Sequence, residues 1–317
     1  MNPDGFLADV LAEPATLAAL ADDCAAAPPP RLDRHDRIVL IGMGSSRFAA
    51  LTIAAALRAR GLDAVAEYAS TQAPSPPRAG TLAVAISASG TTPETVAALE
   101  RHAGTSRTLA LTNHPERALG QLADEVVPLR AGEEAGGIAC KTYQATLALL
   151  HLMAGAEPDA LRRAAQSQHD LFERRGKWLE PLLDLLDGAH TIYAIAPATR
   201  ISSSLESALM FREAPRVNAD GTETGDWTHV DVYMTKRPGY RGLLFPGSSF
   251  DAEVMRWATE RESAIVAIGA PVPGTVQQIA FDHADDPLVA SLVDASVAEL
   301  AAAELWRRFR ADGRALT

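Results

Sequence analysis

The sequence predicts an α/β protein with two doubly wound, flavodoxin-like parallel sheets in tandem and flanking helices. Short apolar runs alternate with helical patterns through the first 130 residues or so, as in a parallel sheet covered on both faces. A long, almost entirely helical stretch follows over residues 141–187, and the alternation then restarts. With 317 residues, 47% of them hydrophobic, the chain is long enough for two domains. We expect them at residues 1–157 and 158–317.

The elements of the first half follow from composition and chain breakers. An Ala- and Leu-rich helix over residues 6–27 is stopped by Pro28-Pro29-Pro30. Runs rich in Val, Ile and Leu predict five strands, at Ile38–Ile41, Ala64–Glu67, Leu82–Ile86, Thr108–Leu111 and Val126–Leu129. Helices are expected from Gly44 to about Arg60 and from about Pro93 to His102.

The second half repeats the pattern after the connecting helices. Those helices are expected at Thr142–Met153 and, as one amphipathic segment, at about Pro158–Leu186. The elements after them are a strand at Thr191–Ile195, a helix at Ser202–Glu213, a strand at Leu243–Phe245, a helix at 251–261, a strand at Ala264–Ile268 and a last helix at Leu288–Arg310.

Two loops of the first half have weaker counterparts in the second. Ile41–Ser45 corresponds to Ile195–Thr199, and Ser87–Gly90 corresponds to Pro246–Ser249. The second copy lacks the glycines of its first loop and keeps fewer hydroxyls. This weak internal repeat therefore predicts one small-molecule site per chain, in the first half.

The segment Ser87-Ala88-Ser89-Gly90-Thr91-Thr92-Pro93-Glu94 carries the strongest chemical signal. Thr91 and Glu94 form a capping-box pattern, and Pro93 suits a first helical turn. Unpaired N–H groups at a helix start, the positive end of the helix dipole and nearby hydroxyls together suit a phosphate dianion. Because this binding needs neither lysine nor metal, it favours a phosphorylated small molecule over a magnesium-bound nucleotide.

A second loop, Gly42-Met43-Gly44-Ser45-Ser46, follows the first strand, so both loops lie at the carboxyl ends of strands, where open sheets bind ligands. A dinucleotide site is disfavoured because Arg47 stands where the third glycine of G-x-G-x-x-G belongs, and no acidic residue for a ribose follows the second strand. No P-loop motif occurs. The cluster His283–Asp286 matches no standard metal site. We expect no cofactor and no metal.

Composition narrows the partners and the compartment. The net charge of −11 and the 5% aromatic content disfavour nucleic acid, whose backbone needs a basic surface. No apolar run approaches the roughly 20 residues of a membrane span, and the N-terminus has no signal-peptide pattern. The two cysteines, Cys24 and Cys140, are far apart in sequence, as in a cytoplasmic protein with free thiols.

With these motifs, the chain resembles the tandem sugar isomerase (SIS) domain family over about residues 30–310. It is similar to the isomerase half of glucosamine-6-phosphate synthase and to stand-alone phosphosugar isomerases, deaminases and deglycases. The resemblance implies a sugar phosphate as ligand. Gly137–Tyr143 looks like the family's loop that closes over the sugar. The implied substrate-binding residues are Gly44, Ser45, Ser46, Ser87, Ser89, Thr92, Ala139 and Cys140.

The resemblance also implies a catalytic pair. Leu205–Glu213 resembles the helix that ends with the family's proton-transferring glutamate, which falls on Glu213. The ring-opening histidine falls on His229, 229 − 213 = 16 positions later; the family often supplies it from the neighbouring subunit, which implies a homodimer with a shared active site. A carboxylate with a raised pKa can carry a proton between C1 and C2, and an imidazole exchanges protons near neutral pH. Taken alone, Glu213 is equally consistent with a solvated glutamate on a helix surface, and His229 with a structural histidine.

Several positions depart from the synthase pattern. Met210 replaces a catalytic lysine, Ala88 replaces a glutamine, and the tail 312–317 has no lysine, leaving Arg314 as its cation. The sequence also has no glutaminase domain. We therefore expect a degradative reaction that isomerises an amino sugar or fructosamine phosphate and releases the amine, as a deaminase or a deglycase. A simple aldose–ketose isomerase and a non-catalytic phosphosugar sensor are the alternatives.

Overall fold

The computed structural model describes residues 1–314; Ala315-Leu316-Thr317, part of the lysine-free tail, lie outside the described residues. The chain packs as two compact units. The N-sheet unit comprises Ala15–Glu133 and Ala139–Leu161, and the C-sheet unit comprises Met1–Pro14, Glu134–Ile138 and Arg162–Thr317. The domain boundary expected between residues 157 and 158 stays a prediction.

Five parallel strands in the order β2-β1-β3-β4-β5 form the sheet of the N-sheet unit. At the centre of the sheet, Ile41 lies opposite Glu67 of β2 and Ala85 of β3. The central strands are almost completely buried, which explains their continuous apolar runs. The strands are β1 (Arg37–Gly42), β2 (Asp63–Tyr68), β3 (Thr81–Ile86), β4 (Arg107–Thr112) and β5 (Glu125–Pro128).

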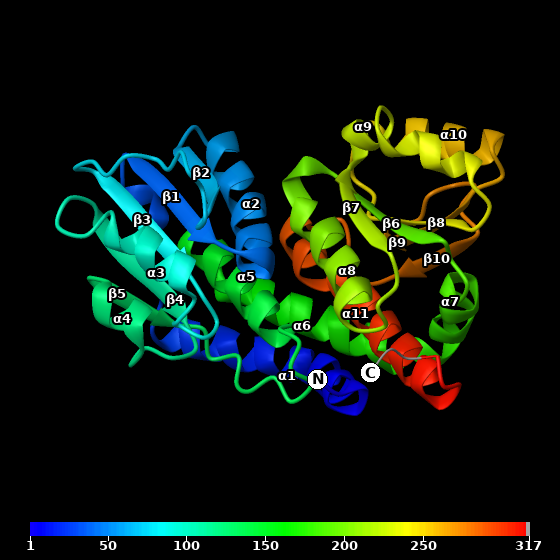
Figure 1. Cartoon of the computed structure of the whole chain (residues 1–317), viewed down its shortest axis with the longest axis horizontal. Helices are drawn as coiled ribbons and strands as arrows, with labels where there is room; N and C mark the ends of the chain where they lie inside the picture. The colour runs from blue at the N-terminus through cyan, green and yellow to red at the C-terminus, as the bar shows by residue number, and fades with distance from the viewer. Residues whose placement is uncertain (315–317) are drawn as a thin grey trace. The chain divides into compact units, whose positions relative to one another are not determined.

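Helices cover both faces of this sheet (Figure 1). On one face lie α2 (Gly44–Ala59) and α5 (Lys141–Met153), and on the other lie α3 (Pro93–Glu100) and α4 (Ala118–Leu122). Ala98 and Leu99 of α3 and Leu119 of α4 pack on alternate residues of the strands, such as Val39 and Ala83. This two-sided cover leaves the strand ends as the places where a ligand can reach the sheet.

The C-sheet unit repeats this topology. Its strand order, β10-β9-β8-β6-β7, is that of the first sheet, with β6 and β8 in the central places of β1 and β3. All registered pairs in it are parallel. The expected pair of parallel-sheet α/β subdomains is confirmed. The strands are β6 (Thr191–Ala196), β7 (Ala219–Glu223), β8 (Tyr240–Leu244), β9 (Ala264–Gly269) and β10 (Gln277–Ala280).

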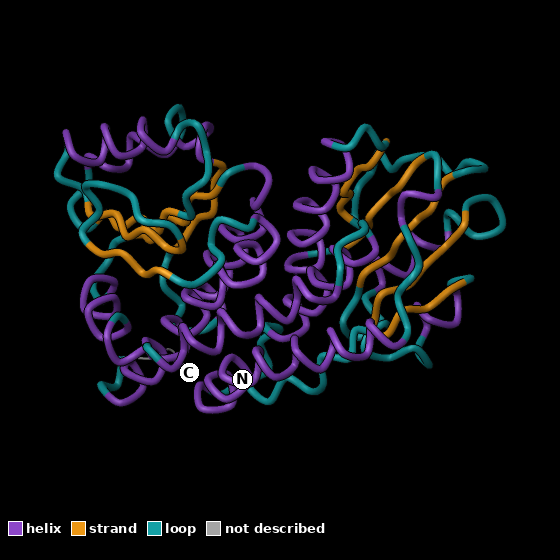
Figure 2. Tube along the Cα trace, turned by 180° about the vertical axis from the view of Figure 1, so that it is seen from behind, coloured by secondary structure: helices purple, strands orange, loops and turns teal. Residues whose placement is uncertain are grey.

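The second sheet is also sandwiched between helices, drawn purple around the orange strands in Figure 2. Helices α8 (Ile201–Glu213) and α11 (Pro287–Ala311) lie on one face, and α9 (Thr224–Trp227) and α10 (Asp251–Glu260) lie on the other. On the α9–α10 face, the Trp227 indole donates a hydrogen bond of 2.9 Å to the Tyr240 hydroxyl, and the ring of Tyr240 stacks on Tyr193. The remaining helices are α1 (Pro3–Ala26), α6 (Pro158–Glu173), α7 (Leu179–Leu186) and four short 3-10 helices, Leu32–Arg34, Arg175–Lys177, Ala198–Arg200 and Asp231–Lys236.

Three local expectations were wrong. The single helix expected at Pro158–Leu186 is two helices, α6 and α7, separated by a 3-10 turn around Gly176. Strands β7 and β10 were not anticipated, because Ala219–Glu223 and Gln277–Ala280 carry few apolar residues. The capping box is also absent, since Thr92 is the N-cap of α3 and its side chain makes no capping hydrogen bond. No helix in the described part of the chain is long and apolar enough to span a membrane.

Candidate active site

The hydroxyl loop, Ser87–Thr92, joins β3 to α3 and gathers its hydroxyl groups in one place. The Ser87 hydroxyl lies 2.9 Å from the Thr92 hydroxyl and 3.5 Å from that of Ser89. Ser87 is buried, whereas Ser89 and Thr92 are half-buried. Because the Thr92 side chain does not cap α3, its hydroxyl faces the other two, and the first turn of α3 has no side-chain acceptor at its cap.

Two glycines allow the close approaches that this region needs. Gly90 has φ of +66°, and a Cβ there would lie 2.9 Å from the Thr112 hydroxyl. The Gly90 amide donates to the Ser87 hydroxyl, which turns the loop back on itself. At the end of β1, a Cβ on Gly42 would lie 3.0 Å from the Ser46 Cβ and 3.1 Å from the Arg47 nitrogen. A larger residue at Gly42 would therefore require the start of α2 to shift.

The glycine loop, Gly42–Ser46, and the hydroxyl loop lie side by side because β1 and β3 are neighbouring parallel strands. The chain leaves β1 toward β2 and leaves β3 toward β4, so this edge is the topological switch point of the sheet. Ser45 and Ser46 occupy the first turn of α2, are half-buried and stand at the same edge as Ser89 and Thr92. The arrangement offers neutral donors and two helix starts to an anion.

The start of α5 is tied to the same edge. The Asn113 amide, just after β4, donates 3.2 Å to the Thr142 hydroxyl of α5, while the Asn113 backbone nitrogen donates to the Ala88 carbonyl. Ala139 and Cys140 directly precede α5; Ala139 is half-buried and Cys140 is fully buried. The structure thus places all eight expected substrate-binding residues in the N-sheet unit.

Two residues at this edge escaped the reasoning from sequence. Asn113 links the hydroxyl loop to α5, and Arg117 donates a hydrogen bond of 3.2 Å to the Ser89 carbonyl. Both lie after β4, in the loop next to the hydroxyl loop. The polar run Thr112-Asn113-His114 directly after a strand was the signal that could have found them.

In the C-sheet unit, the corresponding edge is filled by the protein's own charges. Asp251 accepts hydrogen bonds from the backbone amides of Gly247 and Ser248, at 2.7 and 3.1 Å. These two residues correspond to Ala88 and Ser89 of the hydroxyl loop. Arg200, after β6, is buried and pairs with Asp294 and with the Pro246 carbonyl. An internal carboxylate therefore occupies the position of an external anion, in line with one small-molecule site per chain.

Glu213 is the last residue of α8 and lies at the amino edge of the second sheet. Its side chain is half-buried, and within residues 1–314 no hydrogen bond or ion pair holds its carboxylate. Burial raises the pKa of Glu213 above the ordinary value, and the charges of Arg212 and Arg216 offset this only in part. A half-buried carboxyl with a raised pKa and no fixed partner is suited to exchanging a proton.

His229 is exposed and follows α9, at the carboxyl edge of the same sheet. The intervening strand β7 has five residues, about 16 Å at the usual strand rise. Since β7 starts near the Glu213 edge and ends near the His229 edge, Glu213 and His229 of one chain lie at opposite ends of the sheet. The structure does not bring this predicted pair together within the C-sheet unit.

Comparison with known proteins identifies the segment that carries both loops. Residues 31–156 match the SIS domain family. The matched segment is called the SIS domain below. Over 288 residues the chain is also 26% identical to glutamine–fructose-6-phosphate aminotransferase (isomerizing) of Thermosynechococcus vestitus, a match covering 81% of this chain and 46% of that protein. The chain spans less than half the length of the curated relatives it matches.

Solved structures extend the likeness in fold beyond the SIS domain. The C-terminal domain of glucosamine-fructose-6-phosphate aminotransferase from Francisella tularensis superposes with a TM-score of 0.82 at 14% identity, over 96% of each chain. Glucosamine-6-phosphate deaminase from Thermotoga maritima superposes with a TM-score of 0.77 at 18% identity, over 96% of this chain and 94% of that one. At these identities the likeness establishes the fold of both units.

Outside the SIS domain, the positions that depart from the synthase pattern have structural roles. Met210 is fully buried in α8 and belongs to the core. Arg314 donates two hydrogen bonds to Asp187, at 2.7 and 2.8 Å, and a third to Asp312, so its charge is already engaged. Neither residue presents a free cation in place of a lysine. Among residues 1–314, no cluster of His, Cys, Asp and Glu is arranged to hold a metal ion.

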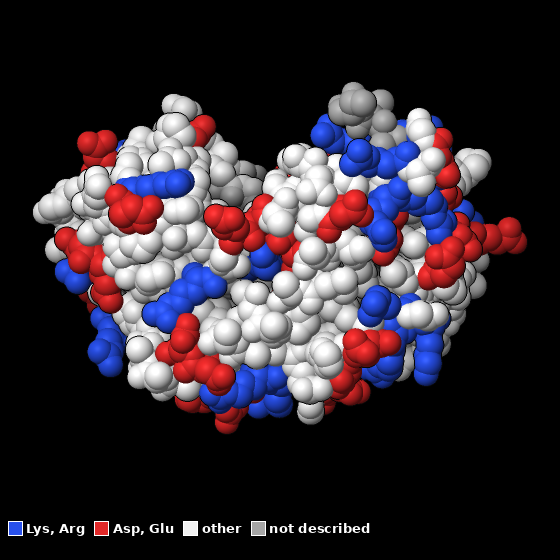
Figure 3. Space-filling model, turned by 90° about the horizontal axis from the view of Figure 1, so that it is seen from below, with Lys and Arg blue, Asp and Glu red and all other residues white. Residues whose placement is uncertain are grey.

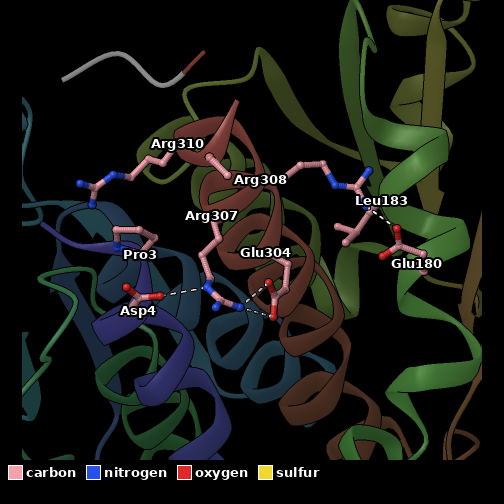
Figure 4. A pocket seen from close by; sticks show the side chains of 9 residues that line it. Pro3, Asp4, Glu180, Leu183, Glu304, Arg307, Arg308 and Arg310 are labelled. Atoms are coloured by element: carbon pink, nitrogen blue, oxygen red, sulfur yellow. Dashed lines mark hydrogen bonds and ion pairs between the residues drawn. The ribbon is translucent and has the colours of Figure 1, made fainter. Parts of the chain in front are cut away.

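A surface hollow of about 510 Å³ lies at the end of α11 and contains none of the predicted site residues (Figure 4). Five of its six charged side chains are paired: Arg307 with Asp4 and Glu304, and Arg308 with Glu180. On the face drawn in Figure 3, acidic and basic side chains are interspersed.

Proposed function

We propose that the chain is a phosphosugar isomerase-type enzyme acting on a 6-phosphorylated amino sugar or fructosamine. In this proposal the glycine and hydroxyl loops hold the phosphate, Glu213 carries a proton between C1 and C2, and His229 opens the sugar ring. The observation that carries the proposal is the clustering of the Ser87, Ser89 and Thr92 hydroxyls at the switch point of a SIS domain.

The chemistry assigned to Glu213 rests on its surroundings. Moving a carbonyl from C2 to C1 breaks one C–H bond and forms another on the adjacent carbon, so a single group must accept and return a proton. A carboxyl group does this best when its pKa approaches the working pH, and burial shifts Glu213 in that direction. Its lack of an ion pair within residues 1–314 leaves the carboxylate available to substrate.

We propose that the enzyme is a homodimer with a shared active site. The placement of Glu213 and His229 at opposite edges of one sheet supports this, because one chain cannot bring both to the same sugar. A second copy that supplies His229 would complete the pair. The proposed site contains no metal or cofactor, because both proton transfers use protein side chains.

The direction of reaction is proposed to be degradative, with release of the amine as ammonia or as an amino acid. The burial of Met210, where the synthase pattern has a lysine, supports a reaction other than synthesis from glutamine. The T. maritima structure with the same fold is described as a deaminase. We further propose that the second sheet is a diverged SIS domain, because it repeats the strand order of the first. The two cysteines are free and buried, which supports a cytoplasmic location.

Deuterium exchange tests the proposal. The protein is incubated in D₂O with glucosamine 6-phosphate, fructose 6-phosphate or a fructosamine 6-phosphate, and deuterium at C1 and C2 is followed by NMR. We expect exchange or amine release with the wild type and a loss of about a hundredfold or more in Glu213→Gln. The matched control is Glu173→Gln, the same change at the exposed last residue of α6.

Each result has a defined meaning. Exchange without amine release would identify a simple aldose–ketose isomerase. Saturable binding of phosphosugars with no exchange in the wild type would show a binding protein instead of an enzyme. Full activity in Glu213→Gln would contradict the assigned proton carrier, and an equal loss in Glu173→Gln would show that the effect is not specific to α8.

A further inference from the structure

Arg47, in the first turn of α2, has an unusual environment for an arginine in this protein. Its guanidinium carbon lies 3.5 Å from the centroid of the Tyr68 ring, in a cation–π stack. Its Nε is buried and has no hydrogen-bond partner. Within residues 1–314 no carboxylate pairs with Arg47, whereas Arg37, Arg107 and many other arginines have an acidic partner.

The Arg47–Tyr68 pair stands at the edge where the SIS domain is proposed to bind phosphate. Arg47 directly follows Ser46 of the glycine loop. Tyr68 is the last residue of β2, registers with Gly42 of β1 and is 52% exposed. The pair therefore lies on the β2 side of the glycine loop, while the hydroxyl loop lies on its β3 side.

We propose that Arg47, held in place by Tyr68, binds an oxyanion of the substrate on the β2 side of the phosphosugar site. The inference rests on the proposed function and adds a residue that determines substrate class. The oxyanion is either the sugar phosphate itself or a carboxylate carried by the amine of a fructosamine phosphate.

The physical case is one of charge and orientation. The two loops offer hydroxyls and amides, which are neutral, in a chain whose net charge is −11. A guanidinium forms two parallel hydrogen bonds with phosphate or carboxylate, and stacking on a ring fixes its plane beforehand. Arg117, another cation at this edge, already donates to the Ser89 carbonyl and lies 3.7 Å from Glu116. Of these two arginines, Arg47 is the one whose charge is uncommitted.

Binding of two ligands that cannot be isomerised tests the proposal by calorimetry. Glucitol 6-phosphate carries only the phosphate, and its 1-deoxy-1-glycine derivative adds a carboxylate on the amine. Arg47→Met keeps the apolar stem, Arg47→Lys keeps the charge, and Arg107→Met removes a charge at the opposite edge of the same sheet. We expect Arg47→Met to weaken binding about tenfold or more at low salt, Arg47→Lys to lose less, and Arg107→Met to bind like the wild type.

The pattern across ligands identifies the oxyanion. Loss on both ligands assigns Arg47 to the phosphate, and loss on the glycine derivative alone assigns it to the carboxylate. Thermal unfolding checks that each variant is folded. Wild-type affinity in folded Arg47→Met, or an equal loss in Arg107→Met, overturns this inference while leaving the proposed function intact. Binding of neither ligand by the wild type would overturn the proposed function and this inference together.

Discussion

At the scale of single residues, the site depends on a backbone conformation as much as on hydroxyl groups. Gly90 has φ of +66° and lies against the Thr112 hydroxyl, so the loop has no room for a Cβ. The Gly90 carbonyl accepts from the Leu119 amide of α4, while its own amide donates to Ser87. One glycine therefore links the hydroxyl loop to the next helix and shapes the proposed phosphate site.

The change Gly90→Ala is predicted to destabilise the protein by about 2–3 kcal/mol, of which about 1 kcal/mol is backbone strain and the rest the contact with Thr112. We expect it also to weaken phosphosugar binding, because the loop must shift. Gly104→Ala is the matched control: Gly104 has φ of +75°, and a Cβ added there would meet nothing within 4 Å, so only the strain applies. Urea unfolding and calorimetry measure the two effects, and equal losses of stability in both variants would contradict the prediction.

At the scale of elements, a buried carboxyl pair joins α1 to α11 within the C-sheet unit. Glu13 of α1 and Glu299 of α11 face each other and are both fully buried. Gln168 of α6 donates a hydrogen bond to Glu13, and the charge of Glu134 acts on both acids. Burial raises the pKa of Glu299 to about 7 and that of Glu13 well above its ordinary value. The folded state is therefore most stable when the Glu13–Glu299 pair carries a proton.

The pH dependence follows from this shift. A carboxyl whose pKa is higher in the folded state stabilises the fold fully below its unfolded pKa of 4.5, and the contribution is lost as pH rises through about 7. We therefore expect Glu299→Gln, which cannot ionise, to gain stability relative to the wild type between pH 5 and pH 8. Thermal unfolding at both pH values measures the difference. The exposed Glu173→Gln should show none, and a Glu299→Gln difference that does not vary with pH would refute the linkage.

The elements also show which features could be predicted from sequence. Buried strands such as β1 and β3 were predictable because both of their faces require apolar residues. Strand β7 was not predictable, because it contains Gly221 where a strand usually has a larger side chain. Glycine is needed there because a Cβ would lie 2.6 Å from the α8 backbone. The glycine and hydroxyl loops were predictable from their position after buried strands. Arg47 was read only as a missing glycine, because its stack on Tyr68 depends on the pairing of β1 with β2.

At the scale of the whole molecule, the two sheets share a topology but differ in their ligand edges. The first presents hydroxyls and helix starts, and the second fills the same place with Asp251 and Arg200. Glu213 and His229 then lie at opposite edges of the second sheet. The site proposed above needs the two loops, Glu213 and a His229 from elsewhere, and a second copy of the chain is the source we propose.

Hybrid dimers test this arrangement. Glu213→Gln and His229→Asn are each predicted to be inactive, but a hybrid dimer has one site that takes Glu213 from one chain and His229 from the other. Random assortment of the two variants makes about half of the dimers hybrid, each with one intact site, so activity returns to about a quarter of wild type in the mixture and about half in purified hybrids. Coexpression with two affinity tags, purification through both, and the D₂O assay measure the recovery. If both residues acted within one chain, the purified hybrid would stay inactive, and the shared site would be refuted.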